Sequence, residues 1–368
     1  MKNILITGGP VHAYLDAVKI ITNRFKGGLM CQLAEALAEH HDARVTYLCA
    51  PSAGAHVPST PGRIERINVP KHKGFEDYRR QVLELAPSMD GIILGPAVAN
   101  LIPVNPWQGK FPSHNYKPGD KIPIEFTIAQ RVIDEVKRVA PSAQLFGFKL
   151  LSGVSHEELI HAAYGIVLEA KATAVIANDE HDLLRKFAVT KERGVHPLGQ
   201  TELAAWIWEM LNDEYYRTET DIGTRHEFEV TAKLRSLIER YKSRFVHAET
   251  GLIFGTVAVR HWSGFLTTGR GKRELNSTAH VRRVDHEKRI VYAAHGAKAS
   301  LNAPLFDRMF ENPEVDAVVH YHEQVPGLPT YPYAPPGSVR DTNRPNAGSF
   351  NINEHGCILL FDIEGRQL

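Results

Sequence analysis

The chain has 368 residues, of which 43% are hydrophobic and 23% are charged, and its formal net charge is +1. This is an ordinary globular composition, and the balanced charge argues against partners such as nucleic acid or a membrane surface. Its three cysteines form no CxxC pair, so we expect reduced thiols in a cytoplasmic protein. We expect neither a secretory leader nor a membrane span, and the length favours two domains.

The first half of the chain alternates short apolar runs with helical patterns. The predicted strands are Ile4–Ile6, Arg44–Ala50, Ile64–Val69, Gly91–Leu94, Gln144–Phe148 and Ala174–Ala177. The predicted helices are Leu29–His40, Phe75–Leu85, Ala129–Val139 and Ser155–Glu169. Alternation at this spacing predicts a mostly parallel sheet covered on both faces. In such sheets ligands bind outside the carboxyl ends of the strands, where the strand order reverses.

Two glycine-containing loops, Thr7–Pro10 and Asn23–Gly28, lie between the first strand and the first helix. Glycine lets backbone N–H groups approach phosphate oxygens, and a helix N-terminus favours anions. The stretch therefore indicates a nucleotide-binding α/β domain, although its spacing matches neither GxGxxG nor GxxxxGK[ST]. The alternative is an ordinary strand-to-helix turn that binds no nucleotide.

Residues 1 to about 217 resemble phosphopantothenoylcysteine synthetase, the phosphopantothenate–cysteine ligase of coenzyme A biosynthesis. The resemblance rests on motifs that occur in the family's order: ILITGGP, DAVKIITNRFKGG, GPAVAN, GKFPS, LFGFK and IANDE. It implies a Rossmann-like ligase, a homodimer or higher homo-oligomer, that activates a carboxylate with CTP or ATP and Mg²⁺. An amine would then attack the resulting acyl-nucleotide, so the implied substrates are a small carboxylate and an amine.

The same resemblance assigns site residues. Asn23 falls on an asparagine that stabilises the activated acyl group, Lys110 falls on a lysine that neutralises triphosphate charge, and Lys19 replaces an arginine near the acyl substrate. The expected nucleotide contacts come from the glycine loops and from the strand ends: Gly8, Gly9, Arg24, Lys26, Ala97, Asn100, Phe148 and Asn178.

Some of these positions have simpler interpretations or depart from the family. Asn23 could instead cap the following helix, and Lys110 could be a solvated loop lysine. Phe25 and Lys26 stand where the family has small serines, and Asn100 stands where it has an aspartate. These departures favour a related but specialised reaction.

The second half of the chain has a different pattern. The polar segment Asp213–Gly223 marks the expected boundary, which gives domains at residues 1–217 and 218–368. An amphipathic helix is expected at Arg225–Phe245 and another helix at Asn302–Glu311. The predicted strands are Gly255–Arg260, Gly264–Thr268, His280–Val284, Arg289–Tyr292 and Ala317–His322. We therefore expect a β-rich α/β domain after the Rossmann-like one.

Three histidines carry the chemistry of this half. His320 and His322 are two residues apart on a predicted strand, so their side chains leave the same face, and His355 lies in a later turn. Three histidines with one open position are typical of a catalytic site for Zn²⁺ or another divalent metal. Structural roles for the three imidazoles are the alternative.

Residues from about 225 to the end also resemble the class II aldolase/adducin family. The carrying motifs are GTVAVRHWSGFLTT, SLNAPLFDRMFENPEVDAVVHYHE, PYAPPGS and NEHG. The resemblance implies that His320, His322 and His355 bind zinc. Asn302 replaces the family's catalytic glutamate and cannot act as a general base. Glu323, Glu354 or Asp341 could take that role, and we expect the ordinary retro-aldol activity to be altered or absent.

Three functions fit these patterns. The first is a nucleotide-dependent carboxylate–amine ligase fused to a zinc-binding aldolase-like domain. The second is a metal-dependent lyase, aldolase or epimerase whose N-terminal domain only binds a nucleotide-linked substrate. The third is a non-catalytic, adducin-like assembly module.

Overall fold

The computed structural model describes residues 1–50, 56–59, 67–221, 231–246, 251–272, 274–294 and 298–368. The chain forms two compact units, Met1–Leu211 and Asn212–Leu368, which divide a few residues before the expected boundary. Within the described ranges, no helix is both long enough and apolar enough to cross a membrane.

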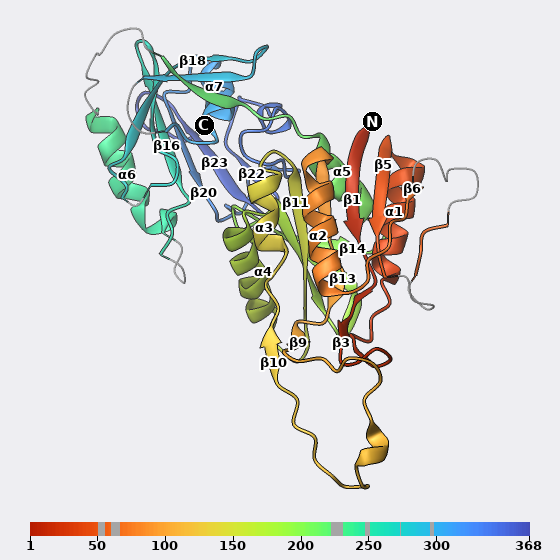
Figure 1. Ribbon diagram of the computed structural model, residues 1–368. Coiled ribbons are helices and arrows are strands. Elements are labelled where there is room, and N and C mark those ends of the chain that lie inside the picture. Colours follow the sequence, from red (N-terminus) through yellow and green to blue (C-terminus); the bar gives the residue numbers. More distant parts are fainter. Residues whose placement is uncertain (51–55, 60–66, 222–230, 247–250, 273, 295–297) are drawn as a thin grey trace. The chain divides into compact units, whose positions relative to one another are not determined.

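The first unit is built on an eight-stranded sheet with the order β14-β13-β12-β11-β7-β1-β5-β6 (Figure 1). The parallel strands are β1 (Lys2–Thr7), β5 (Ala43–Leu48), β6 (Ile67–Asn68), β7 (Gly91–Leu94), β11 (Gln144–Leu151) and β12 (Ala174–Asp179). The antiparallel strands β13 (Asp182–Thr190) and β14 (Val195–Gly199) extend the sheet beyond β12. Counted along the chain, the parallel strands have the Rossmann-type order 3-2-1-4-5-6.

Helices cover both faces of this sheet. They are α1 (Gly28–His40), α2 (Phe75–Leu85), α3 (Ile133–Val139), α4 (His156–Ala170) and α5 (Leu203–Asn212), with a short helix η2 (Ala86–Ser88) after α2. Figure 1 shows α2, α3 and α4 side by side on one face. Right-handed crossovers put α1 on the opposite face, where His41 stacks on Trp208 of α5 with ring centroids 5.0 Å apart. Burial on both faces explains why β1 and β7 are continuous apolar runs.

Short strands surround the carboxyl end of β1. They are β2 (Pro10–Val11), β3 (Ala13–Tyr14), β4 (Ile20–Ile21), β8 (Ala97–Val98), β9 (Leu101–Pro103) and β10 (Phe126–Ile128). β2 pairs with β8, while β3–β4 and β9–β10 form antiparallel pairs. Residues 104–125, here called the strap, run between β9 and β10 and carry a short helix η3 (Ser113–Asn115). Figure 1 shows the strap as a long excursion in orange and yellow.

The second unit is a nine-stranded sheet with the order β15-β19-β18-β17-β16-β20-β23-β22-β21. Its strands are β15 (Arg217–Asp221), β16 (Thr256–His261), β17 (Gly264–Thr268), β18 (Thr278–Asp285), β19 (Ile290–Ala294), β20 (Ala317–Tyr321), β21 (Thr330–Tyr331), β22 (Phe350–Ile352) and β23 (Gly356–Phe361). Only the β15–β19 and β21–β22 pairs of this sheet are parallel among the described residues.

Two helices pack on opposite faces of this second sheet, and a short helix η4 (Arg340–Thr342) follows later. Val257 and Val259 of β16 belong to the same apolar cluster as α6 (Ala232–Phe245). Ala258, between them, belongs to the cluster that contains α7 (Ala303–Phe310). This alternation is the period-two pattern of a strand that is buried on both sides.

The α/β prediction is therefore confirmed: the first unit is Rossmann-like and mostly parallel, and the second is a β-rich α/β fold. Ala129 was expected to start a helix, but α3 begins later, at Ile133. The Ala129 N–H, next to β10, donates to the Asn100 carbonyl instead. Strands β13, β14 and β15 and helix α5 were not predicted. Residues 64–66 of the predicted third strand and 225–230 of the predicted amphipathic helix lie outside the described residues.

Candidate functional site

The strand order of the first unit reverses at β1. This strand pairs with β5 on one side and with β7 on the other. Gly8 and Gly9 follow β1, and Gly95 follows β7, with the Gly95 N–H donating to the Thr7 carbonyl at 3.2 Å. This reversal point is where a doubly wound sheet leaves a crevice for a ligand.

Glycine is required at three positions around this point. A Cβ on Gly27, whose φ is +87°, would come within 3.0 Å of Gly9 backbone atoms. A Cβ on Gly8 would meet Tyr47, and one on Gly95 would meet Met30, equally closely. The Gly9 and Gly27 loops thus pack backbone to backbone, which a larger residue at Gly27 would prevent, while Gly8 and Gly95 pack against side chains.

The N-terminus of α1 opens at this same place. Gly27 is the N-cap residue of α1, and no side chain caps the helix. The first-turn N–H groups of such a helix are suited to phosphate oxygens. The alternative role of Asn23 as the helix-capping residue is therefore wrong.

Asn23 links the two sides of the reversal point. Its Nδ2 donates to the carbonyl oxygen of Val98 at 2.8 Å, so the loop after β4 is tied to β8. β8 is itself paired with β2, and the Ala97 N–H donates to the Gly9 carbonyl at 3.0 Å. The structure thus brings Asn23, Ala97, Gly8 and Gly9 together.

The two cations of the Asn23 loop have different surroundings. Arg24 forms an ion pair with Glu180, which follows β12, and its guanidinium lies over the Phe25 ring at 5.1 Å from the centroid. The Lys26 side chain is exposed, and its backbone carbonyl accepts a hydrogen bond from His56 N–H at 3.0 Å. The bulky residues that replace the family's serines are therefore accommodated at the surface.

Asp16, a residue that sequence reasoning missed, contacts both Lys19 and the strap segment that carries Lys110. The Asp16 carboxylate is only 2% exposed and accepts a hydrogen bond from Lys19 Nζ at 2.9 Å. It also accepts one from the Phe111 N–H, next to Lys110, at 2.9 Å. The Lys19 ammonium has the largest effect on the pKa of Asp16 and holds it well below its usual range. Backbone N–H donors lower this pKa further. The available signal was that the motif DAVKIITNRFKGG begins at Asp16, but its burial cannot be read from the sequence.

The remaining predicted nucleotide contacts lie further along the sheet edge. Asn100 is exposed, whereas Phe148 lies inside β11, opposite Ile176 of β12. Asn178 is buried in β12, and its Nδ2 donates to the Ile176 carbonyl at 3.0 Å. β11 and β12 are the next strands beyond β7, and the end of β12 reaches the Asn23 loop through the Arg24–Glu180 ion pair.

Two buried histidines near the same strand ends were also missed. His12 Nδ1 lies 3.0 Å from Thr22 Oγ1, directly before Asn23, and burial lowers the pKa of His12. His72 is 1% exposed, and burial lowers its pKa to about 4. Both imidazoles are therefore neutral at pH 7.

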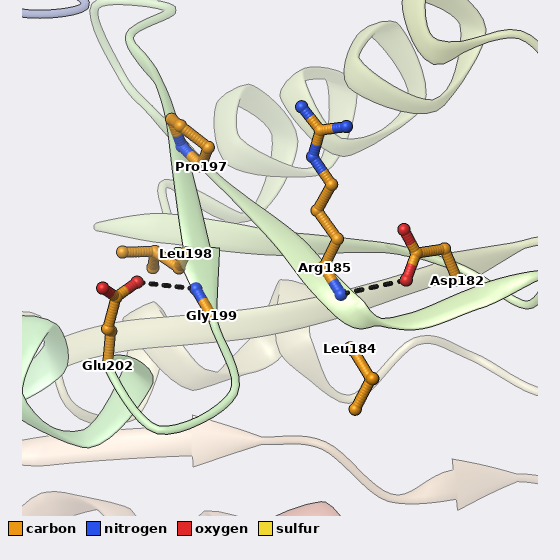
Figure 2. A pocket seen from close by; sticks show the side chains of 7 residues that line it. All are labelled: Asp182, Leu184, Arg185, Pro197, Leu198, Gly199 and Glu202. Carbon is orange, nitrogen blue, oxygen red and sulfur yellow. Dashed lines mark hydrogen bonds between the residues drawn. The ribbon is translucent and has the colours of Figure 1, made fainter.

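A cavity of about 450 Å³ lies at the far edge of this sheet (Figure 2). Its lining residues come from β13, β14 and the turn before α5: Asp182, Leu184, Arg185, Pro197, Leu198, Gly199 and Glu202. Figure 2 shows the side chains of Leu184 and Arg185 on opposite sides of β13. The carboxylates of Asp182 and Glu202 accept backbone N–H groups of Arg185 and Gly199. Three strands separate this cavity from β1, so it is not part of the reversal point.

The second unit brings His320, His322 and His355 together. One possible ligand atom from each lies within 4.8 Å of the others, and the ring centroids are 4.6 to 5.1 Å apart. His320 is the penultimate residue of β20, His322 follows that strand, and His355 precedes β23.

The turn that carries His355 has a specific geometry. Glu354 has a φ of +52° and Gly356 a φ of +129°. A Cβ on Gly356 would come within 3.0 Å of the Tyr321 carbonyl oxygen and the His322 Cα. The Asn-Glu-His-Gly turn therefore sits directly against the strand that carries the other two histidines.

The environment of His320 fits a metal ligand. Its Nδ1 donates to the Cys357 carbonyl at 2.9 Å, while its buried Nε2 has no hydrogen-bond partner among the described residues. Burial lowers the pKa of His320 to about 4, so the imidazole is neutral. A neutral imidazole that is oriented through one nitrogen and open at the other is the form that binds divalent metals.

The surroundings of the histidines differ from the sequence expectations about a base. Asn302 is buried at the N-cap of α7, and its N–H bonds to Ser300 Oγ at 3.2 Å. Glu323 forms an ion pair with Arg244, and the buried Asp341 forms one with Arg344 at 3.0 Å. Lys272 instead acts electrostatically on His320, and burial lowers the pKa of Lys272 to about 8.

The chain is 29% identical over 221 residues to the coenzyme A biosynthesis bifunctional protein CoaBC of Thermococcus kodakarensis, and the alignment covers 57% of this chain and 51% of the relative. The chain thus spans about half the length of the curated relatives it matches. Among solved structures, the DNA/pantothenate metabolism flavoprotein from Streptococcus pneumoniae aligns with 57% of this chain and 97% of its own, at 21% identity and a TM-score of 0.49.

The L-fuculose-1-phosphate aldolase from Thermus thermophilus aligns with 35% of this chain and 77% of its own, at 14% identity and a TM-score of 0.26. A score this low does not establish a shared fold, so the aldolase-like nature of the second unit stays a prediction. The protein-family model described as the DNA/pantothenate metabolism flavoprotein C-terminal domain matches residues 1–199. That match covers more than half of the 368 residues of the chain. The chain therefore belongs to the DNA/pantothenate metabolism flavoprotein C-terminal domain family.

Proposed function

We propose that the first unit is a nucleotide-dependent ligase that joins a carboxylate to an amine through an acyl-nucleotide. Family membership supports this, as does the name of the Thermococcus relative, which assigns that protein to coenzyme A biosynthesis. The observation that carries the proposal is the position of Asn23. Its amide is tied to Val98 where two glycine-bearing loops meet beside the uncapped N-terminus of α1.

The proposed reaction has two steps. A carboxylate oxygen attacks the α-phosphorus of CTP or ATP, and pyrophosphate leaves. The amine then attacks the acyl carbon, and the nucleoside monophosphate leaves with one of the carboxylate oxygens. Mg²⁺, when bound with the nucleotide, shields the charge of the triphosphate.

Each named residue has a role in this scheme. The first turn of α1, which no side chain caps, would offer N–H groups to the phosphates. Lys19 and Lys110 would neutralise anionic oxygens, and the Asn23 amide would hold the acyl group as charge develops on it. The uncapped N-terminus of α1 fits a phosphate because its first-turn N–H groups have no side-chain cap.

A screen of pyrophosphate release tests the proposal. The full chain is incubated with Mg²⁺, CTP or ATP, and a panel of carboxylates with amines. We expect release that depends on one class of carboxylate and falls about 100- to 1000-fold in Asn23→Ala. Asn343→Ala, which removes an exposed asparagine of the second unit, should keep the wild-type rate. Wild-type protein that releases no pyrophosphate with any acid would overturn the proposal.

The second unit suggests a second activity. We propose that His320, His322 and His355 hold Zn²⁺ or another divalent metal and serve a lyase, aldolase or epimerase reaction. What supports this is the convergence of the three rings and the buried Nε2 of His320. A bound metal would polarise a substrate carbonyl. Asn302 cannot supply the base, so proton transfer would use another group.

Metal analysis is the first test of this second activity. We expect one equivalent of divalent metal in the wild type and loss of that metal in His320→Ala. His261→Ala is the matched control, because His261 lies on β16 of the same unit and belongs to neither group of described side chains that could hold a metal. Metal that persists in His320→Ala would refute the three-histidine site.

Activity assays then separate the remaining functions. Metal-dependent cleavage or epimerisation that survives Asn23→Ala and disappears in His320→Ala would favour the lyase alternative. If neither activity is found while the folded chain self-associates, the assembly-module alternative gains support.

Self-association is also part of the ligase proposal, and light scattering in solution measures it. Exposed apolar side chains around the β3–β4 and β9–β10 pairs support self-association, notably Val18, Ile20, Leu101 and Ile128.

A further inference from the structure

A single buried carboxylate joins two loops of the first unit. Asp16 lies in the turn of the β3–β4 hairpin and is 2% exposed. Its nearest partners come from its own turn and from the strap, which is far away in the sequence. A buried carboxylate that is fully hydrogen-bonded holds its neighbours in a defined geometry.

The two oxygens of Asp16 have separate tasks. Oδ1 accepts the backbone N–H groups of Val18 at 2.7 Å and Lys19 at 2.5 Å, which shapes the hairpin turn. Oδ2 accepts Lys19 Nζ and the backbone N–H of Phe111, each at 2.9 Å. One oxygen therefore builds the turn, and the other fastens the strap to it.

Lys110 is held from both sides by these contacts. The carbonyl of Gly109, which precedes it, accepts the Ala17 N–H at 3.0 Å. The N–H of Phe111, which follows it, bonds to Asp16. The backbone of Lys110 is thus fixed against the hairpin turn while its side chain stays exposed.

Aromatic contacts reinforce the same junction. The Phe111 ring contacts the Trp107 ring edge-on, with ring centroids 4.7 Å apart. The backbone N–H of Trp107 donates to the Leu15 carbonyl at 3.0 Å. Lys19 Nζ lies 5.6 Å from the centroid of the Phe111 ring. The ammonium of Lys19 is therefore beside the strap residue that follows Lys110.

We propose that Asp16 is a positioning residue that fastens the strap to the β3–β4 turn so that Lys19 and Lys110 flank one anionic substrate group. The inference rests on the proposed ligase function, in which both lysines meet substrate oxygens. The ligand class is an oxyanion, either the triphosphate of the nucleotide or the carboxylate being activated. Asp16 itself touches no substrate; it acts through the two lysines.

The Asp16→Asn variant separates the two tasks. The asparagine carbonyl can still accept the Val18 and Lys19 N–H groups, but its NH₂ faces two other donors, Phe111 N–H and Lys19 Nζ. Asp120→Asn is the matched control, because Asp120 makes the same kind of bond to Lys117 N–H within the strap but none to the hairpin. Pyrophosphate release from CTP or ATP is measured in both, with the acids found in the screen.

We expect kcat/KM to fall about 10- to 100-fold in Asp16→Asn, because misplaced charges lose their effect steeply. It should change less than about twofold in Asp120→Asn, an exposed site. In a Lys19→Ala, Lys110→Ala background, Asp16→Asn should cost little more, because both charges that Asp16 positions are already gone. The same fold-loss with and without the two lysines would overturn the proposal, since it would mean that Asp16 does not act through them.

Hydrogen exchange gives a readout that does not depend on activity. In the wild type, a peptide spanning residues 109–112 should exchange more slowly than one spanning 121–124 in the same strap. Asp16→Asn should remove that difference, and Asp120→Asn should preserve it. Equal exchange of the two peptides in the wild type would overturn the fastening even if Asp16→Asn fails to fold. Absence of pyrophosphate release in the wild type would instead overturn the proposed ligase function. The exchange result alone would then test whether Asp16 fastens the strap.

Discussion

At the scale of single residues, burial decides the chemistry of several histidines that look alike in the sequence. His72 and His320 are each 1% exposed and have a pKa of about 4, lowered first by burial. The sequence can place a histidine beside a predicted strand, but not the neighbouring elements that bury it. His12 and His72 were therefore missed, whereas the spacing of His320 and His322 was readable because both lie on one predicted strand.

Buried His72 should make the first unit less stable in acid. Its pKa is 6.5 when unfolded and about 4 when folded, so the unfolded state binds more protons between these values. The free energy of unfolding should therefore fall as the pH drops from 6.5 to 4. His72→Phe should reduce this fall by about 2–3 kcal/mol.

Urea unfolding at several pH values, followed by tryptophan fluorescence, measures this effect. Val82→Ala is the control, because it removes buried apolar volume from the same unit without removing a titratable group. Parallel stability curves for wild type and His72→Phe would contradict the expectation.

At the scale of elements, glycine fixes how closely neighbouring segments approach. The Gly8–Gly9 turn and the Gly27 turn contact each other in the first unit, and the Gly356 turn contacts β20 in the second. The sequence signals the turns, since glycine and asparagine are frequent in them. It does not reveal which segment each turn meets, because Gly27 and Gly356 contact residues that are 18 and 35 positions away in the chain (27 − 9 and 356 − 321).

The Gly356 turn gives a test that changes no metal ligand. Gly356→Ala should lower the affinity of the metal-free protein for Zn²⁺ about 10- to 100-fold, because the added Cβ displaces the turn that carries His355. Gly365→Ala is the control: its φ is also positive, at +80°, but nothing lies within 4 Å of the added Cβ. Calorimetric titration measures both, and wild-type affinity in Gly356→Ala would count against the three-histidine centre.

The limits of prediction are also visible at this scale. Strong apolar runs such as Gly91–Leu94 and the helix Phe75–Leu85 were predicted with their observed bounds. Short strands such as β2, β8 and β9 carry no periodic signal, because they have only two or three residues. Their pairing around β1 is a tertiary effect. The Asp16 junction depends on that pairing and on the strap, so it could not be predicted.

At the scale of the whole molecule, the two units have separate sheets and separate candidate sites. Asn23, Lys19 and Lys110 belong to the first unit, and the three histidines belong to the second. Alternating strands and helices predicted the Rossmann-like unit because each crossover carries its own helical signal. The sequence could not say whether one unit depends on the other for activity.

Separate sites should respond separately to substitution. Asn23→Ala should retain the wild-type metal content, and His320→Ala should retain pyrophosphate release within about twofold, as expected for sites that share no residues. Metal analysis and the pyrophosphate assay on the same two preparations measure this. One substitution that abolishes both properties would mean that the two units act as one.

The most direct test of the central claim follows an oxygen atom. A carboxylate substrate found in the screen is labelled with ¹⁸O and turned over with the nucleotide, Mg²⁺ and an amine. An acyl-nucleotide predicts that one ¹⁸O atom appears in the nucleoside monophosphate and none in the released pyrophosphate. Label in inorganic phosphate, or in no phosphorus-containing product, would contradict acyl-nucleotide formation at the reversal point of this sheet.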